Sequence, residues 1–288
     1  MYDAHVHIAL DGLDYNRMKD VHACGADVEH IRRVFDEYRG AGVGFLRDGG
    51  DRWGVSSLAK RLAPEYGIDY RTPAFAIYKK GSYGSILGRF FESFSDFKVL
   101  VNSAMDMGAD FIKIMGSGIM DFNEYGLISP CTLEKDEIRD MISYCHDKGM
   151  SVMVHCNGND NLTAFVMAGA DSIEHGFFMG EDIPEMMAEI NVIWIPTVTP
   201  VAELNGKPGF NPEVIDKILK SHREMIKKAL SLGVDIGTGS DAGSFAVPHK
   251  EGAGKEYDYL LDIAKDEKAL SCTLTKTKED LMTRFKRA

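Results

Sequence analysis

Two histidines alternate on a short apolar segment at the amino-terminal end of the chain. His5 and His7 lie in DAHVHI, two residues apart. Side chains at positions i and i+2 of a β-strand point to the same side, so both imidazoles can reach one metal ion. Asp3 shares this face and is interpreted as a supporting or interior residue. By itself the pair is more typical of exposed histidines on a strand, so a metal site needs further ligands.

A lysine lies in the middle of a strongly apolar segment. Lys113 occupies the centre of FIKIM, where burial of an ammonium group is costly unless its charge is compensated or removed. The lysine either pairs with a buried carboxylate, reaches solvent from the strand end, or loses its proton. In the third case desolvation lowers its pKa until the neutral amine captures CO₂. The resulting carbamate is a bidentate anion that can bridge two cations.

Three further ligand-capable residues end or follow apolar segments later in the chain. His155 ends SVMVH, His175 ends DSIEH, and Asp241 follows IGTGS. Each alone is ordinary, either a hydrogen-bonded core histidine or a turn aspartate. The small residues before Asp241 allow a sharp turn that places a carboxylate at a strand end. Five segments that each deliver a ligand to a carboxyl end are improbable by chance, and together they predict a metal site.

Short apolar segments alternate with longer amphipathic segments along almost the whole chain. This alternation favours a closed parallel (β/α)₈ barrel, the TIM-barrel architecture, over an open doubly wound sheet. The eight predicted strands are 2–8, 43–48, 70–77, 110–115, 151–155, 171–175, 192–197 and 234–238. Glycine closes helical segments before the next strand, as C-caps prefer, at Gly42, Gly108, Gly149, Gly169 and Gly233. Long segments follow strands at 9–28, 78–93, 116–133 and 198–212, which predicts an active site at the carboxyl ends.

Length, composition and charge limit the class of protein. The 288 residues are 44% hydrophobic and carry a net charge of −11, which fits one large domain over residues 1–288. The negative charge disfavours a nucleic acid or an anionic membrane as partner. Five cysteines without a CxxC pair argue against a disulfide framework or a cysteine zinc site. Without a membrane-spanning run or a signal peptide, the expected location is the cytoplasm.

The ordered motifs resemble those of the amidohydrolase superfamily, in the branch with two metal ions and a carboxylated lysine. DAHVH is similar to its first-strand motif, FIKIMGSG to its lysine strand, and VMVHCNG, SIEHG and GTGSDAGS to its later ligand motifs. Flanking segments such as VGFLRDGG and LGVDIGTGSDAG look like imidazolonepropionase and prolidase-like members. The resemblance covers about residues 2–270. Members of this branch usually carry a small β-sandwich, which we expect to be absent here, and GTGSDAG is two residues longer than the usual GTDAG.

The resemblance implies a ligand set and a mechanism. His5, His7 and Asp241 would hold one divalent ion, and His155 and His175 the other. Carboxylated Lys113 would bridge them, together with a shared hydroxide. Zinc is the expected metal, with manganese and iron suited comparably. The hydroxide would attack a carbonyl while Asp241 moves the proton to the leaving nitrogen.

The expected activity is hydrolysis of an amide or related C–N bond of a small molecule, such as a dipeptide or an N-acyl amino acid. Residues in the long loops are predicted to contact the substrate: Tyr83, Arg89, Tyr125, Asn157 and His249. Arg89 is expected to bind a substrate carboxylate in a bidentate manner. Barrel surface left free by the missing sandwich would suit a homo-oligomer.

Other functions remain open at this point. The same site would serve hydrolysis of an ester, lactone or phosphoester, and fold analogy does not choose between them. A non-catalytic metal-binding relative would keep the ligands without turnover. A one-metal deaminase is disfavoured because no HxxE follows His155. IGTGSDAG lacks the GxGxxG spacing and follows the last strand, so a dinucleotide site is set aside.

Overall fold

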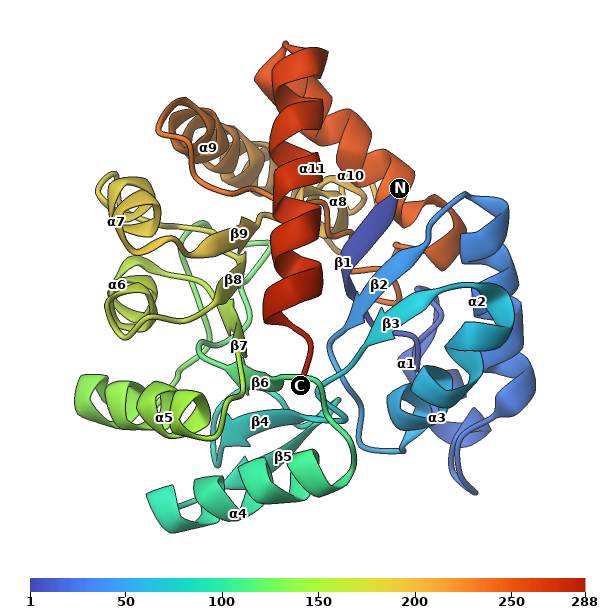
Figure 1. Cartoon of the computed structure of the whole chain (residues 1–288). Coiled ribbons are helices and arrows are strands. Elements are labelled where there is room, and N and C mark those ends of the chain that lie inside the picture. The colour runs from blue at the N-terminus through green and yellow to red at the C-terminus, as the bar shows by residue number, and fades with distance from the viewer. Residues whose placement is uncertain (288) are drawn as a thin grey trace.

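The computed structural model describes residues 1–287 and consists of strands surrounded by helices (Figure 1). The strands pair in parallel within two sheets, ordered β1-β2-β3 and β5-β4-β6-β7-β8-β9. Parallel pairing requires a crossover between strands, which the intervening helices provide. The strands are β1 (Tyr2–Val6), β2 (Phe45–Asp48), β3 (Asp69–Arg71), β4 (Ala76–Lys79), β5 (Gly88–Phe91), β6 (Ile112–Met115), β7 (Val152–Cys156), β8 (Ser172–His175) and β9 (Ile193–Ile195).

The predicted strand at 70–77 is interrupted in its middle. β3 pairs with β2, and β4 pairs with β6, so the two halves belong to different sheets. Pro73 between them has no N–H to donate, and Ala74 has a φ of 64° that strands do not use. The predicted loop 78–93 also contains a strand, β5, which pairs with β4.

The prediction of a regular strand at 234–238 is wrong. Ile236 is the one residue of this segment that forms a β-bridge, an isolated one to Trp194. The segment nevertheless makes backbone hydrogen bonds to both neighbouring strands, β9 and β1. Trp194 donates its backbone N–H to the Asp235 carbonyl at 2.9 Å, and Ala4 donates to the Thr238 carbonyl at 2.8 Å. The segment thus lies between β9 and β1 at the eighth position of the ring, although no continuous ladder closes the barrel within residues 1–287. Gly237 offers no side chain to pack on neighbouring strands, which weakens regular pairing.

The predicted helical segments are confirmed, and the five predicted capping glycines all have positive φ, between 69° and 82°. Helices α2 and α5 each present apolar residues to the strands on one face, as amphipathic sequences require. The helices are α1 (Tyr15–Val21), α2 (Val28–Gly40), α3 (Val55–Leu62), the 3₁₀ helix η1 (Ala63–Tyr66), α4 (Phe94–Asp106), α5 (Lys135–Asp147), α6 (Asn159–Met167), α7 (Ile183–Ile190), α8 (Val198–Ala202), α9 (Pro212–Ser231), α10 (His249–Ala264) and α11 (Glu267–Arg284).

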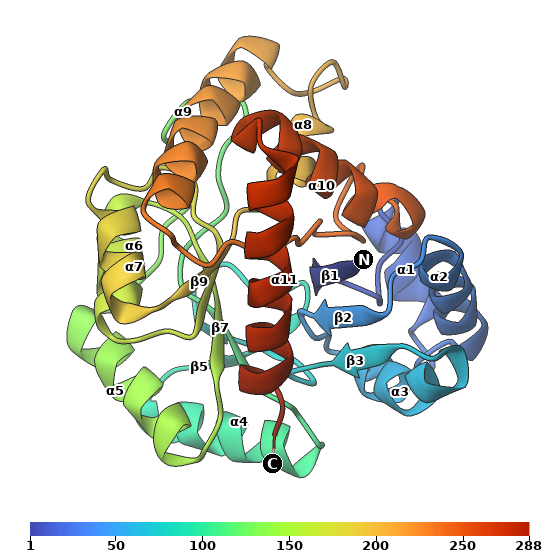
Figure 2. The ribbon, with the colours of Figure 1, turned by 45° about the horizontal axis from the view of Figure 1, so that its top comes forward.

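Helix α11 lies across the amino-terminal ends of the strands (Figures 1 and 2). The Ser151 hydroxyl, just before β7, donates to the Arg284 carbonyl at 2.7 Å. Arg284 in turn donates to the carbonyl of Asn191, just before β9, at 2.8 Å. Lys276 pairs with Asp235 at 2.7 Å. Because these partners precede their strands, α11 covers the amino-terminal end of the ring and leaves the carboxyl ends for chemistry.

No helix within the described part of the chain is long and apolar enough to cross a membrane. A cytoplasmic location and a homo-oligomeric state stay predictions. All pairs between the strands of residues 1–287 are parallel, so no β-sandwich occurs among them.

Candidate metal centre

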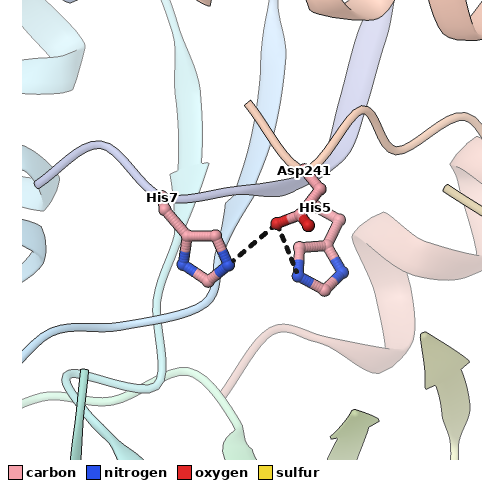
Figure 3. A group of neighbouring side chains, drawn as sticks. All are labelled: His5, His7 and Asp241. Carbon is pink, nitrogen blue, oxygen red and sulfur yellow. Dashed lines mark ion pairs between the residues drawn. The ribbon is translucent and has the colours of Figure 1, made fainter. Parts of the chain in front are cut away.

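His5, His7 and Asp241 form a compact cluster at the carboxyl end of β1. His7 Nε2 lies 3.1 Å from Asp241 Oδ1, and His5 Nε2 lies 3.7 Å from the same oxygen. Figure 3 shows this carboxylate oxygen between the two imidazoles. One potential ligand atom from each residue lies within 4.8 Å of the other two. Two imidazoles and a carboxylate are a donor set that suits a divalent transition metal.

The two extra residues of the GTGSDAG motif do not move Asp241 away from this cluster. Ser240 donates its backbone N–H to Asp3 Oδ1 at 2.8 Å and its hydroxyl to Asp3 Oδ2 at 2.5 Å. Asp241 itself donates its backbone N–H to the His5 carbonyl at 2.8 Å. The inserted pair therefore fastens the turn to β1, and Asp3 has the supporting role that the sequence predicts. Burial raises the pKa of the Asp3 carboxyl to about 7.

A buried ion pair orients the ring of His5. Its Nδ1 donates to Glu174 Oε2 at 2.7 Å, which leaves Nε2 free to bind a metal ion. The other carboxylate oxygen of Glu174 accepts from Arg47 at 2.8 Å and from the Ser172 hydroxyl at 2.6 Å. Glu174 and Arg47 have no exposed surface. Such an outer partner fixes the tautomer and raises the basicity of a metal-binding imidazole.

His155 and His175 extend the cluster across β7 and β8. Their ring centroids are 4.6 Å apart, and the ring of His175 lies 4.9 Å from that of His5. His175 Nδ1 hydrogen-bonds the buried Thr197 hydroxyl at 2.7 Å, which leaves Nε2 free. His155 Nε2 donates to the Gly118 carbonyl at 3.3 Å, which leaves Nδ1 free. The two residues therefore present one free nitrogen each to a common region.

Three imidazoles at this end, those of His5, His155 and His175, are held in the neutral form. Burial lowers the pKa of His155 to about 3 and that of His5 and His175 well below the ordinary 6.5. The nearby Lys113 ammonium lowers the pKa of all three further. Only neutral imidazole binds a metal ion, so the environment keeps these groups ready to act as ligands.

Lys113 projects into the same end of the ring from β6. It is 2% exposed, and its Nζ has no hydrogen-bond partner among the described residues. Burial, reinforced by the positive charge of Arg47, lowers the pKa of Lys113 from 10.5 to about 8, although Glu174 and Asp241 act in the opposite direction. A buried polar group without a partner is rare in folded proteins and needs an explanation.

The backbone at this rim is strained at three functional positions. His175, Thr197 and Asp241 have φ values of 71°, 48° and 56°, in the left-handed region that non-glycine residues seldom adopt. Each such residue costs on the order of 1–3 kcal/mol, and strain of this kind clusters at active sites. Gly49 is needed for close approach, because a Cβ there would lie 2.3 Å from His7 Cε1.

A cavity of about 370 Å³ opens above these residues and is lined by all six predicted ligands. Tyr83 and Asn157, two of the five predicted substrate residues, also line it. The Tyr83 ring lies 5.4 Å from that of His155, and burial raises the pKa of Tyr83 to about 12. Asn157 Oδ1 accepts the Phe177 backbone N–H at 3.0 Å. The side chain of Asn157 therefore shapes the loop as well as facing the cavity.

The other three predicted substrate residues do not reach the cavity. Arg89 lies in β5, where its guanidinium carbon is 4.0 Å from the centroid of the Phe75 ring. Tyr125 packs on Phe178 at a centroid distance of 5.3 Å and is 36% exposed. His249 begins helix α10 and is 3% exposed. Arg89 and His249 thus lie in a strand and a helix rather than in the loops where they were predicted.

His249 instead belongs to a group of three buried histidines that hold the loop after β1. Each donates through Nε2 to a backbone carbonyl of three consecutive loop residues: His30 to Ile8 at 2.7 Å, His22 to Ala9 at 3.0 Å and His249 to Leu10 at 2.8 Å. Leu10 lines the cavity. The group therefore positions one wall of the site without contacting its contents.

The sequence alone does not predict the roles of Glu174, Arg47, Ser172 and Thr197. The signal available was a charged residue within an apolar strand, Arg47 in FLRD and Glu174 in SIEH. Both charges are costly to bury alone, so two of opposite sign indicate a pair. Nothing in the sequence says which histidine such a pair contacts.

The sequence of the chain identifies the protein family to which it belongs. Its sequence matches the model of the amidohydrolase family over residues 1–268, so the chain belongs to this family, as the motifs predict. An uncharacterized protein of Mycobacterium bovis is 26% identical over 144 residues, which cover 48% of this chain and 38% of that protein. Ochratoxinase of Aspergillus niger is 26% identical over 143 residues, which cover 46% of this chain and 29% of that protein. The matches thus span well under half the length of both curated relatives.

A solved structure gives the fold over nearly the whole chain. The crystal structure of a Xaa-Pro dipeptidase with bound methionine in the active site superimposes with a TM-score of 0.79 at 22% identity. The superposition covers 99% of this chain and 75% of that one. At this identity the likeness shows the fold alone, and it confirms the α/β barrel class.

Proposed function

We propose that this chain is a metal-dependent hydrolase that cleaves an amide or related C–N bond of a small molecule. His5, His7 and Asp241 would hold one divalent ion, and His155 and His175 would hold a second. Lys113, carboxylated by CO₂, would provide a ligand to both. Zinc is the preferred metal, with manganese and iron as alternatives. Dipeptides and N-acyl amino acids are the substrates that the sequence suggests within this class.

The observation that carries the proposal is Lys113, a buried amine without a hydrogen-bond partner among the described residues and facing the same cavity as the imidazoles. Its lowered pKa of about 8 leaves part of the amine neutral near physiological pH. The neutral nitrogen forms a bond to the carbon of CO₂ and releases one proton, which gives an anionic carbamate. Starting from the buried ammonium cation, two protons leave in all, one before and one after the C–N bond forms. A buried anion next to neutral imidazoles and a carboxylate is itself unfavourable, so this donor set suits cations.

Two bound divalent ions would supply hydroxide at neutral pH and polarise the substrate carbonyl. Asp241 is suited to move the proton, because its carboxylate faces the cavity with 14% of its side chain exposed. It accepts one proton from the attacking water and returns it to the leaving nitrogen. The new C–O bond replaces the C–N bond, and one water is consumed to give a carboxylic acid and an amine. Glu174 holds His5 fixed throughout through its bond to Nδ1.

A panel of dipeptides, N-acyl amino acids, simple amides, lactones and phosphotriesters tests the proposal on protein reconstituted with zinc. We expect turnover of amides, with release of one amine per cleavage, and its loss on chelation. Asp241→Asn is expected to lower kcat by at least about 100-fold, in line with general acid–base catalysis. Asp258→Asn on the exposed face of α10 is the control and should leave kcat unchanged. Turnover of a lactone without turnover of any amide would overturn the proposal.

A further inference from the structure

We infer that the cavity accepts uncharged, hydrophobic amides that carry an aromatic group and no free carboxylate. The inference rests on the proposed function, because it names the substrate class for the same site. It departs from the dipeptides and N-acyl amino acids that the sequence suggests, since both of these carry a carboxylate.

Apolar side chains from several loops make up most of the wall above the ligand cluster. Ile86 and Leu87 come from the loop between β4 and β5, Met120 from the segment after β6, and Leu204 from the turn after α8. Phe177, from the loop after β8, is fully buried and lines the same space. Apolar walls favour a ligand in proportion to the apolar area that it removes from water. A charged group on the ligand would lose its water here without replacement.

The charges that line the cavity within residues 1–287 do not suit a carboxylate. Lys113 is the one cationic side chain among them, and under the proposed function it becomes an anionic carbamate. Asp11 and Asp14 add negative charge at the rim, and Arg17 is already bound to Asp11. Arg89, the expected carboxylate partner, packs on Phe75 outside the cavity. The proposed ions are needed at the scissile amide, so a substrate carboxylate would have no cationic partner of its own among the residues that line the cavity.

An aromatic cluster at the mouth of the cavity indicates the shape of the hydrophobic group that the substrate carries. Phe122, Phe210 and Phe245 come from three different loops, and their rings meet at centroid distances of 5.9 Å and 6.0 Å. Phe245 is 55% exposed although it lines the cavity. Aromatic rings pair favourably at such distances in offset or edge-to-face geometry. A flat aryl group on the substrate would complete this cluster and cover the exposed ring.

A matched pair of substrates tests the inference on the full chain loaded with zinc. N-benzoyl-2-phenylethylamine and N-benzoyl-phenylalanine share the acyl group, the amide and the phenyl ring, and differ by one carboxylate. We expect kcat/KM to be at least about tenfold higher for the neutral compound, because an unpaired buried carboxylate is strongly disfavoured. Equal values, or a preference for the acid, would overturn the inference.

Two variants locate the origin of the preference. Phe245→Arg adds a cation to the cavity mouth at an exposed position, so folding should be little affected. We expect it to lower the neutral-to-acid ratio of kcat/KM at least about tenfold, as a charge-assisted pair forms with the carboxylate. Phe90→Arg is the matched control, because Phe90 is 50% exposed and lies in β5 outside the cavity. An unchanged ratio in Phe245→Arg, or an equal change in Phe90→Arg, would overturn the inference.

Failure of the proposed function gives a different result. If no amide of any kind is hydrolysed, the hydrolase proposal fails, and calorimetry on the same zinc-loaded protein then measures Kd for the two compounds. A Kd at least about tenfold lower for the neutral compound would still support the inference about the cavity. Equal binding, or tighter binding of the acid, would overturn it.

Discussion

Replacing Glu174 by glutamine removes one charge from the centre of the barrel with little change of shape. The carboxylate accepts hydrogen bonds from His5, Arg47 and Ser172 at 2.7, 2.8 and 2.6 Å. A glutamine keeps one acceptor oxygen and presents an NH₂ group in place of the other. The NH₂ group of the glutamine then faces another hydrogen-bond donor, either the ring N–H of His5 or the guanidinium of Arg47.

The structure sets the expected size of two effects. Arg47 and Glu174 are both fully buried, and removing one partner of such a pair costs about 3–5 kcal/mol of unfolding free energy. His5 also loses the carboxylate that fixes its tautomer, and loss of such a partner weakens metal binding about 10–100-fold. We therefore expect Glu174→Gln to lower both the stability of the metal-free protein and its affinity for zinc.

Urea unfolding of the metal-free protein and zinc titration against a competing chelator measure the two effects separately. Glu189→Gln, an exposed position on α7, serves as the control and should change neither quantity. If Glu174→Gln unfolds at the wild-type urea concentration and binds zinc with wild-type affinity, the interpretation of the His5, Glu174 and Arg47 contacts is refuted.

Further predictions concern the approach of the backbone to His7 and the response to acid. Gly49→Ala would place a methyl group 2.3 Å from His7 Cε1, so we expect zinc affinity to fall at least about tenfold. Gly40→Ala is the control, because its methyl group meets nothing within 4 Å, and this variant should bind zinc with wild-type affinity. Burial lowers the pKa of His222 to about 4, so the unfolded chain takes up the proton first as the pH falls. Stability present above pH 6.5 should therefore be lost between pH 6.5 and 4, by about 3 kcal/mol from this residue. Urea unfolding at pH 7 and at pH 4.5 measures how much unfolding free energy each protein loses between these two pH values. His222→Gln, which does not titrate, should lose correspondingly less than the wild type. Identical losses in both proteins would contradict the assignment.

Strand positions and ligand order followed from local sequence because both depend on short-range patterns. The apolar segments around His5, Lys113, His155 and His175 are strands or strand ends in the structure. The capping glycines were predictable for the same reason, since a helix end needs positive φ within one or two residues. The segment 234–238 makes only an isolated bridge at Ile236, because its pairing depends on partners in β9 and β1 that are distant in sequence.

The substrate residues were less predictable, because loop conformation depends on partners elsewhere in the chain. The chemistry of arginine predicts Arg89 as a substrate contact, but β5 pairs with β4 and directs its guanidinium to Phe75. His249 is predicted to contact the substrate from a loop, but its ring hydrogen-bonds to the Leu10 carbonyl. Glu174 has no role that the sequence predicts, yet it reaches His5 across the barrel. Each outcome was decided by a contact between segments far apart in the sequence.

A crystal structure of protein reconstituted with zinc and bicarbonate, with anomalous data at the zinc edge, tests the two-ion site most directly. We predict two anomalous peaks beside His5, His7, His155, His175 and Asp241, with density for a carboxylate group on Lys113 Nζ between them. A free amine at Lys113 with one ion or none would contradict the proposed centre.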